Sequence, residues 1–127
     1  MLLTELFFAD KPRRAAALAE LGLAPMQAGA LQVLDPERPM PMSALAQGLL
    51  CDNSNVTGIV DRLEAAGLVQ RRPDEHDRRV KTLVVTPKGA EVRAQVGEAM
   101  ATPPPALAAL PATDARVLRD LLRRALG

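Results

Sequence analysis

Basic side chains gather in residues 71–88, and short polar side chains gather in the stretch before this segment. The segment 71–88 holds six Lys or Arg residues against three Asp or Glu residues, in a chain whose formal net charge is only +1. Binding to nucleic-acid phosphates needs such clustering, because each neutralised phosphate releases counterions. A solvated charge run has the same composition, so the neighbouring elements must decide between the two.

The stretch NSNVTGIVDRLEAA, residues 53–66, predicts an amphipathic helix. Its apolar residues recur at i, i+3, i+4 and i+7, namely Val56, Ile59, Val60 and Leu63. Asp52 stands at the N-cap position, and Gly67 can adopt the left-handed conformation that ends a helix. The other face is short and polar, which fits the major groove, about 12 Å wide. An ordinary surface helix shows the same pattern, so this helix alone does not establish DNA binding.

A second helix is expected just before it, over residues 43–50. Ser43 can cap this helix, and its large apolar side chains are expected to point inward: Leu45, Leu49 and Leu50. The short connection at Cys51 and Asp52 then gives the two helices the spacing of a helix-turn-helix.

A β-hairpin is expected after the two helices. Alternating apolar residues predict strands over 68–72 and 80–85, and the Pro and Asp content of 73–79 predicts the turn between them. A short edge strand is expected at 40–42. The order helix, turn, helix, hairpin is that of a winged helix.

Further helices are expected on both sides of this lobe. The first covers 2–21, where Pro12 should break or kink it, and a shorter one covers 23–34. Thr86 is expected to cap a helix that follows the hairpin. A proline-rich hinge over 102–111 then leads to a last helix.

The last helix is expected to begin at Thr113 as its N-cap. It carries a wide apolar stripe, made by Val117, Leu118, Leu121, Leu122 and Ala125. Packing against its own domain is one explanation of that stripe. Pairing with a second copy of the chain is favoured, because symmetric dimers are the commonest oligomers.

Composition excludes several classes of protein. A chain of 127 residues with one cysteine has no internal disulfide, which favours a reducing, cytoplasmic location. No apolar stretch is long enough to span a bilayer, so no membrane partner is expected. The chain has no Trp or Tyr and only two Phe residues, so it lacks the stacking side chains of single-strand and RNA binders.

Cys51 and His76 are the only cysteine and histidine of the chain, and each has a structural and a chemical interpretation. Cys51 can be a small buried apolar group or, less favoured, a redox-sensing thiol near a helix N-terminus. His76 lies among acidic residues in a turn, where a contiguous cluster rarely has metal-ligand geometry. Neither has an oxyanion feature beside it, so no enzyme, metal or cofactor is expected.

The stretch VDRLEAAGLVQRRPDEHDRRVKTLVVTPKG, residues 60–89, resembles the core signature of the MarR family of bacterial transcription regulators. GLAPMQAGALQVL and LPATDARVLRDLLRRAL resemble that family's second and last helices. The resemblance implies a homodimer that binds a pseudo-palindromic DNA operator. It also implies a nucleoid-associated protein of the bacterial cytoplasm, commonly a repressor released by a ligand or oxidant.

The resemblance also assigns roles to residues. It implies that Arg79 enters the minor groove and that Asp77 orients its guanidinium. It places four residues against the major groove: Asn53, Ser54, Thr57 and Gly58. The other DNA-binding candidates are Asn55, Arg62, Arg72, Arg78 and Lys81. Gly58 departs from the longer side chain frequent in the family.

The expected fold class is mainly α with a small β-hairpin wing, in one domain over 1–127. Residues 23–89 form the winged helix-turn-helix lobe, and 1–22 and 90–127 form dimerisation helices. A small apolar effector is expected against aliphatic walls such as Leu6, Phe7, Met26 and Leu45. The alternative function is a winged-helix protein–protein interaction module without specific DNA binding.

Overall fold

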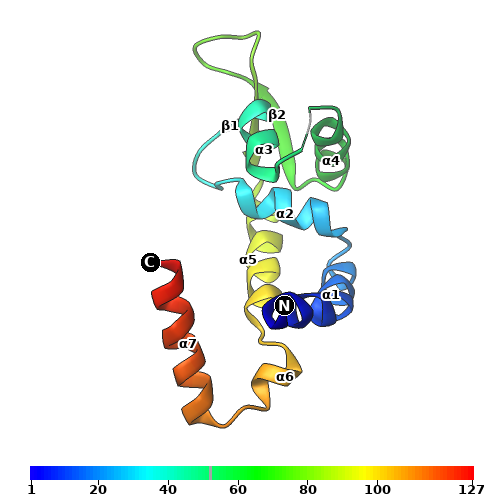
Figure 1. Cartoon of the computed structure of the whole chain (residues 1–127). Helices are drawn as coiled ribbons and strands as arrows, with labels where there is room; N and C mark the ends of the chain where they lie inside the picture. Colours follow the sequence, from blue (N-terminus) through cyan, green and yellow to red (C-terminus); the bar gives the residue numbers. More distant parts are fainter. Residues whose placement is uncertain (52) are drawn as a thin grey trace.

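The computed structural model describes every residue except Asp52, and of Asn53 it describes the backbone alone, so the expected Asp52 cap lies outside the described residues. The fold is mainly helical with a small antiparallel sheet, as predicted (Figure 1). The elements are α1 (Leu2–Glu20), α2 (Pro25–Val33), β1 (Met40–Pro41), α3 (Met42–Leu49), α4 (Asn53–Ala65), β2 (Val69–Pro73), β3 (Lys81–Val85), α5 (Pro87–Ala101), α6 (Pro105–Ala108) and α7 (Ala112–Leu126).

The core of the lobe lies between α2, α3, α4 and the sheet. The apolar stripe predicted on α4 is buried, with Val60 fully enclosed and Leu63 nearly so. Leu31 of α2, Leu45 of α3 and Leu83 of β3 meet it from the other elements. Gly67 ends α4 with φ +74°, so the predicted left-handed residue is confirmed.

The predicted wing is present, with a third strand at its edge. The strand order is β1-β3-β2, and both pairs are antiparallel. Val69 pairs with Val85 at the base of the hairpin, and Pro73 pairs with Lys81 at its outer end. The loop after that last pair extends away from the helices (Figure 1).

One of the three N-cap predictions that fall on described residues is confirmed. The Thr86 hydroxyl accepts a hydrogen bond from the Gly89 N–H at 3.0 Å, so it caps α5. The predictions for Ser43 and Thr113 were wrong, because the N-caps of α3 and α7 lie two residues earlier in each case. There a proline holds the extended backbone of the N-cap position, Pro41 with ψ 147° and Pro111 with ψ 145°.

Leu50 does not point inward, contrary to the prediction. It is the C-cap of α3 with φ 53° and ψ 38°, and its side chain is 94% exposed. Because the left-handed backbone reverses the chain after α3, the helical spacing that would bury Leu50 no longer applies. Leu45 is buried and Leu49 packs partly against the core.

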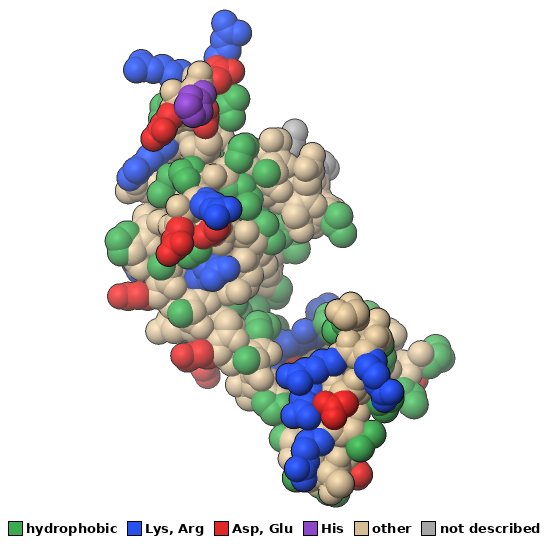
Figure 2. Space-filling view, turned by 90° about the vertical axis from the view of Figure 1, so that its left-hand side faces the viewer, with side chains coloured by type: hydrophobic (Ala, Val, Ile, Leu, Met, Phe, Trp, Pro, Cys, Tyr) green, Lys and Arg blue, Asp and Glu red, His purple; other side chains and the backbone are tan. Residues whose placement is uncertain are grey.

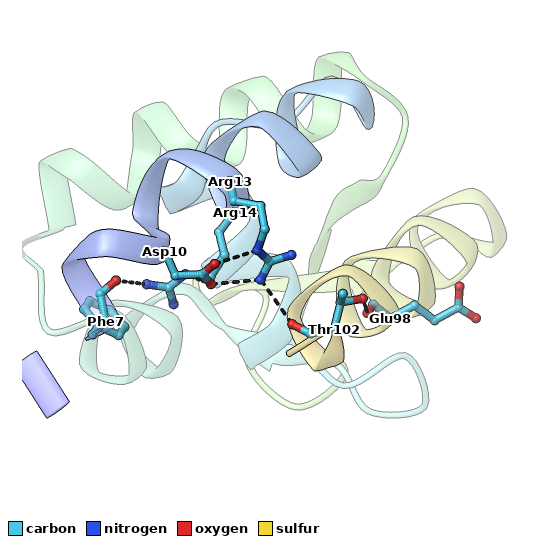
Figure 3. A network of polar contacts seen from close by, with 6 residues as sticks. All are labelled: Phe7, Asp10, Arg13, Arg14, Glu98 and Thr102. Atoms are coloured by element: carbon cyan, nitrogen blue, oxygen red, sulfur yellow. Dashed lines mark hydrogen bonds and ion pairs between the residues drawn. The ribbon is translucent and has the colours of Figure 1, made fainter. Parts of the chain in front are cut away.

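Pro12 was expected to break or kink the first helix, and it does not break α1, which continues from Leu2 to Glu20. Two side chains that follow the proline bond to groups that precede it (Figure 3). Arg13 pairs with the Asp10 carboxylate at 2.5 and 2.8 Å, and the Arg14 guanidinium donates to the Phe7 carbonyl at 3.0 Å. These bridges join the two halves of α1 across Pro12, which has no N–H to donate a helix hydrogen bond of its own.

The same network ties α1 to the end of α5. Asp10 is only 8% exposed, and Arg13 also donates to the Thr102 carbonyl at 3.1 Å (Figure 3). The hydrogen bond from Arg13 lowers the pKa of Asp10, although its burial acts in the opposite direction. This network was not predicted from the sequence, although the spacing of Asp10, Arg13 and Arg14 at i, i+3 and i+4 was a signal for it.

We expect the Asp10 network to make stability depend on acid pH. Because the folded pKa is lowered, the network stabilises the fold above the ordinary aspartate pKa of about 4, and its contribution is lost as pH falls through the folded value. Asp10→Asn should therefore melt below the parent protein near neutral pH. That difference in melting temperature should shrink below about pH 4, and a constant difference across the range would contradict the expectation.

Candidate nucleic-acid interface

The outward face of α4 is polar at its N-terminal end. The side chains of Ser54, Asn55 and Thr57 are exposed there, as are Gly58 and, one turn further on, Arg62. The Asn53 side chain, predicted to share this face, lies outside the described part of the chain. A Cβ built on Gly58 meets no atom within 4 Å, so the backbone is open to a partner at this position.

Carboxylates shape the backbone of the wing loop. Asp74 Oδ2 accepts hydrogen bonds from the N–H groups of His76 at 3.0 Å and Asp77 at 3.1 Å. Asp77 Oδ1 accepts from the N–H of Arg79 at 3.0 Å. Short acidic side chains stabilise tight turns in this way. The loop thus presents Arg78 and Arg79 as exposed side chains, and Figure 2 shows Lys and Arg side chains at the far end of the wing.

The predicted contact between Asp77 and the Arg79 guanidinium is not the one observed. Within the described residues no salt bridge joins the two side chains, and Asp77 contacts the Arg79 backbone. A carboxylate two residues upstream reaches the N–H of a turn more readily than the end of a long side chain. Asp77 therefore positions Arg79 through the loop.

Arg71 joins the wing to α4. Its guanidinium pairs with Asp61 at 2.6 Å and with Glu64 at 2.8 Å, and its backbone N–H donates to Glu64 at 2.9 Å. These hydrogen bonds, the backbone one first, lower the pKa of Glu64. Arg71 is thus neutralised by α4 and does not add to the phosphate-binding charge of segment 71–88. Sequence reasoning missed this clamp, although Asp61 and Glu64 lie one turn apart on one helix face.

The remaining basic residues divide between structural and exposed positions. Lys88 donates to the Ala66 carbonyl at 3.0 Å, where it stabilises the C-terminal end of α4. Arg72 and Lys81 are exposed near the outer end of the hairpin, and the Arg72 guanidinium donates to Gln70 at 2.9 Å. The exposed cations of the wing are therefore Arg72, Arg78, Arg79 and Lys81.

Cys51 and His76 are the two lone residues that could carry chemistry other than DNA binding. Cys51 is a half-buried free thiol that packs against the core. Among the described residues, no group of three or more His, Cys, Asp or Glu side chains is arranged to hold a metal ion. None of the helices in the described part of the chain has the length and apolar character needed to cross a membrane.

A cavity of about 320 Å³ lies between α1, α2 and α5. Its walls are mainly apolar, from Phe7, Phe8, Ala15, Leu18, Ala28, Val96 and Met100. Two cations also line it, Lys11 and Arg14, and the Arg14 guanidinium stacks 4.1 Å from the centre of the Phe7 ring.

Of the four residues expected to line an effector site, one lies in the wall of this cavity. Phe7 lines the cavity, but Leu45 is enclosed in the lobe core and the exposed Met26 is not part of the wall. Leu6 lines a second, smaller cavity beside Asp10. The other three residues lie elsewhere because apolar character alone does not indicate which helices pack together.

Comparison with known proteins agrees with this architecture. The sequence profile of the MarR family matches residues 23–81, which include α4 and most of the wing. A transcriptional regulator from Thermotoga maritima of known structure is 34% identical, with a TM-score of 0.75 over 99% of this chain and 89% of its own. The chain belongs to the MarR family. The expected resemblance is thereby confirmed, and proteins of the MarR family are transcription regulators, not enzymes.

Further matches are found both among solved structures and among curated sequences. A MarR family protein from Bacillus stearothermophilus is 27% identical, with a TM-score of 0.81 over 98% of this chain and 87% of its own. The helix-turn-helix-type regulator YcgE of Bacillus subtilis is 38% identical over 69 residues, which are 54% of this chain and 45% of the relative. The chain spans about half the length of the curated relatives it matches.

Proposed function

We propose that this protein is a transcription regulator that binds a specific site in double-stranded DNA. The observation that carries the proposal is the Arg71 clamp, which joins the polar face of α4 and the basic wing into one unit. The short side chains of α4 suit the base edges of the major groove. The exposed arginines of the wing suit the narrow, electronegative minor groove beside it.

We propose further that the operator is pseudo-palindromic and that a homodimer binds it. The supporting feature is α7, none of whose residues is buried and which stands away from the lobe (Figure 1). Its face exposes Val117, Leu121 and Leu122, and α1 exposes Leu2 and Leu3. Exposed apolar surface of this extent marks an interaction site, and a two-fold dimer matches half-sites about one DNA turn apart.

In this proposal the chain divides as its sequence suggests. Residues 23–89 form the DNA-binding lobe, while 1–22 and 90–127 form the dimer base. The protein acts in the bacterial cytoplasm at the nucleoid, as a repressor that an effector releases. The effector has an apolar body and an acidic group, because the cavity combines aromatic and aliphatic walls with Lys11 and Arg14.

A gel-shift titration tests this function. The probe is the DNA immediately upstream of the protein's own gene, with random competitor DNA at two salt concentrations. We expect tight binding that resists competitor and weakens steeply with salt. If sites selected from random DNA also bind no better than competitor, the protein-interaction alternative replaces this proposal.

Gly58→Ala should separate stability from DNA binding. The added methyl group meets open space, so the helix should gain about 1 kcal/mol in free energy of unfolding. If the bare backbone at position 58 approaches the DNA, the same methyl group should reduce operator affinity. Urea denaturation and gel shifts on one preparation measure both, and unchanged affinity would exclude close approach at Gly58.

A further inference from the structure

Gln32 of α2 and Arg93 of α5 are interlocked by three hydrogen bonds. The Gln32 side-chain amide donates to the Arg93 carbonyl at 2.8 Å. In return, Arg93 Nε donates to the Leu34 carbonyl at 3.0 Å and Arg93 Nη2 donates to the Gln32 carbonyl at 3.2 Å. We call this set the α2–α5 latch. Both side chains are partly buried, so water competes only weakly for these bonds.

The α2–α5 latch closes the end of α2. Leu34 is the C-cap of that helix, and the last carbonyls of a helix lack partners within it. A guanidinium satisfies two of them and also complements the negative end of the helix dipole. Because the guanidinium is planar and its donors diverge at fixed angles, the latch restricts both sliding and rotation of α2 against α5.

The position of the latch on α5 determines what it controls. The first turn of α5 is anchored on the hairpin, since the Thr86 N–H bonds the Leu68 carbonyl at 3.0 Å. Arg93 lies further along, where α5 passes α2 on its way to α6 and α7 (Figure 1). Two separated contacts fix the orientation of α5 relative to the lobe, whereas with a single contact α5 could rotate about it. The latch therefore fixes the angle between the lobe and the helices that lead to α7.

We propose that Arg93, held by Gln32, is a positioning residue that sets the half-site spacing which the protein accepts in its operator. The proposal rests on the proposed function, because it needs a dimer whose two lobes bind one DNA. A small change in the angle between α2 and α5 moves one lobe's α4 relative to the rest of the dimer, and this displacement grows with the distance of α4 from the α2–α5 contact. One base pair is a step of only about 3.4 Å along the DNA, so a modest loss of angular restraint admits neighbouring spacings.

The test compares DNA duplexes that differ only in half-site spacing. The parent protein first selects its preferred site from random duplex DNA. Affinities are then measured for that site, for versions with one base pair added or removed at the centre, and for a single half-site. The proteins compared are the parent, Arg93→Ala, Arg93→Lys and Gln32→Met. Glu91→Ala is the matched control, because it changes an exposed side chain on the same helix.

We expect the parent to discriminate against the wrong spacings by about tenfold or more. Arg93→Ala should reduce this ratio to a few fold while its half-site affinity stays at the parent value. Arg93→Lys should lie between them, because an ammonium keeps the charge but loses the divergent donors. Gln32→Met removes one hydrogen bond of the latch but keeps a side chain of similar length, so it should also weaken discrimination. It provides the test if Arg93→Ala fails to fold.

Three outcomes would overturn parts of the argument in distinguishable ways. If the Arg93 and Gln32 variants keep the parent's spacing ratio, the latch does not set spacing. If their affinity falls equally for every spacing and for the half-site, the latch has only a structural role. If the parent itself selects no paired site, the proposed function fails, and the role of Arg93 fails with it.

Discussion

Replacing Arg79 by alanine is expected to lower affinity for a mapped operator by about 10- to 100-fold without unfolding the protein. Arg79 is exposed on the wing loop, and its backbone N–H donates to Asp77, which holds the loop at this position. A guanidinium in this place suits a narrow A·T-rich minor groove, where the negative potential is enhanced. The loss should therefore be largest for operators with A·T-rich flanks, as gel shifts on paired A·T-rich and G·C-rich duplexes would measure.

Two further variants make the Arg79 result interpretable. Arg38→Ala removes the same charge from an exposed residue outside α4, the wing and the dimer base, and it should leave operator affinity nearly unchanged. Asp77→Ala keeps the Arg79 side chain but releases the backbone that presents it, so it should cause a smaller loss. Equal affinity of Arg79→Ala and parent protein on both kinds of flank would refute the minor-groove role.

Gly89→Ala is expected to destabilise the fold by about 3 kcal/mol or more. A Cβ built on Gly89 lies 2.0 Å from the Leu68 carbonyl oxygen and 3.0 Å from Val85 Cγ1. The oxygen cannot move freely, because it accepts the Thr86 N–H that starts α5. The added methyl group must therefore displace α5 from the hairpin or break that hydrogen bond.

Gly97→Ala is the matched control for Gly89→Ala. It makes the same substitution on the same helix, at a position where the added Cβ meets nothing within 4 Å. It should stabilise α5 by about 1 kcal/mol. Urea denaturation at one protein concentration measures both changes, since an oligomer's stability depends on concentration. If Gly89→Ala unfolds at the same urea concentration as the parent, the close approach to Leu68 is not a constraint in solution.

The local features of this protein were determined by its sequence. The buried stripe of α4, the Thr86 cap, the left-handed Gly67 and the antiparallel hairpin all follow from residues a few positions apart. Periodicity and capping act over that range, so a linear pattern is enough to predict them. Even there, α3 and α7 begin earlier than predicted, because the prolines two residues upstream of the predicted caps hold the N-cap positions.

Only the tertiary structure decided which partners the polar side chains have. Arg71 counts as a free cation in the sequence but is paired with α4, and Asp77 holds the Arg79 backbone rather than its guanidinium. The α2–α5 latch joins groups 59 and 61 residues apart, and no linear pattern marks it. Such pairs exist because packed helices exclude water and leave each buried polar group only the partners that the packing brings within reach.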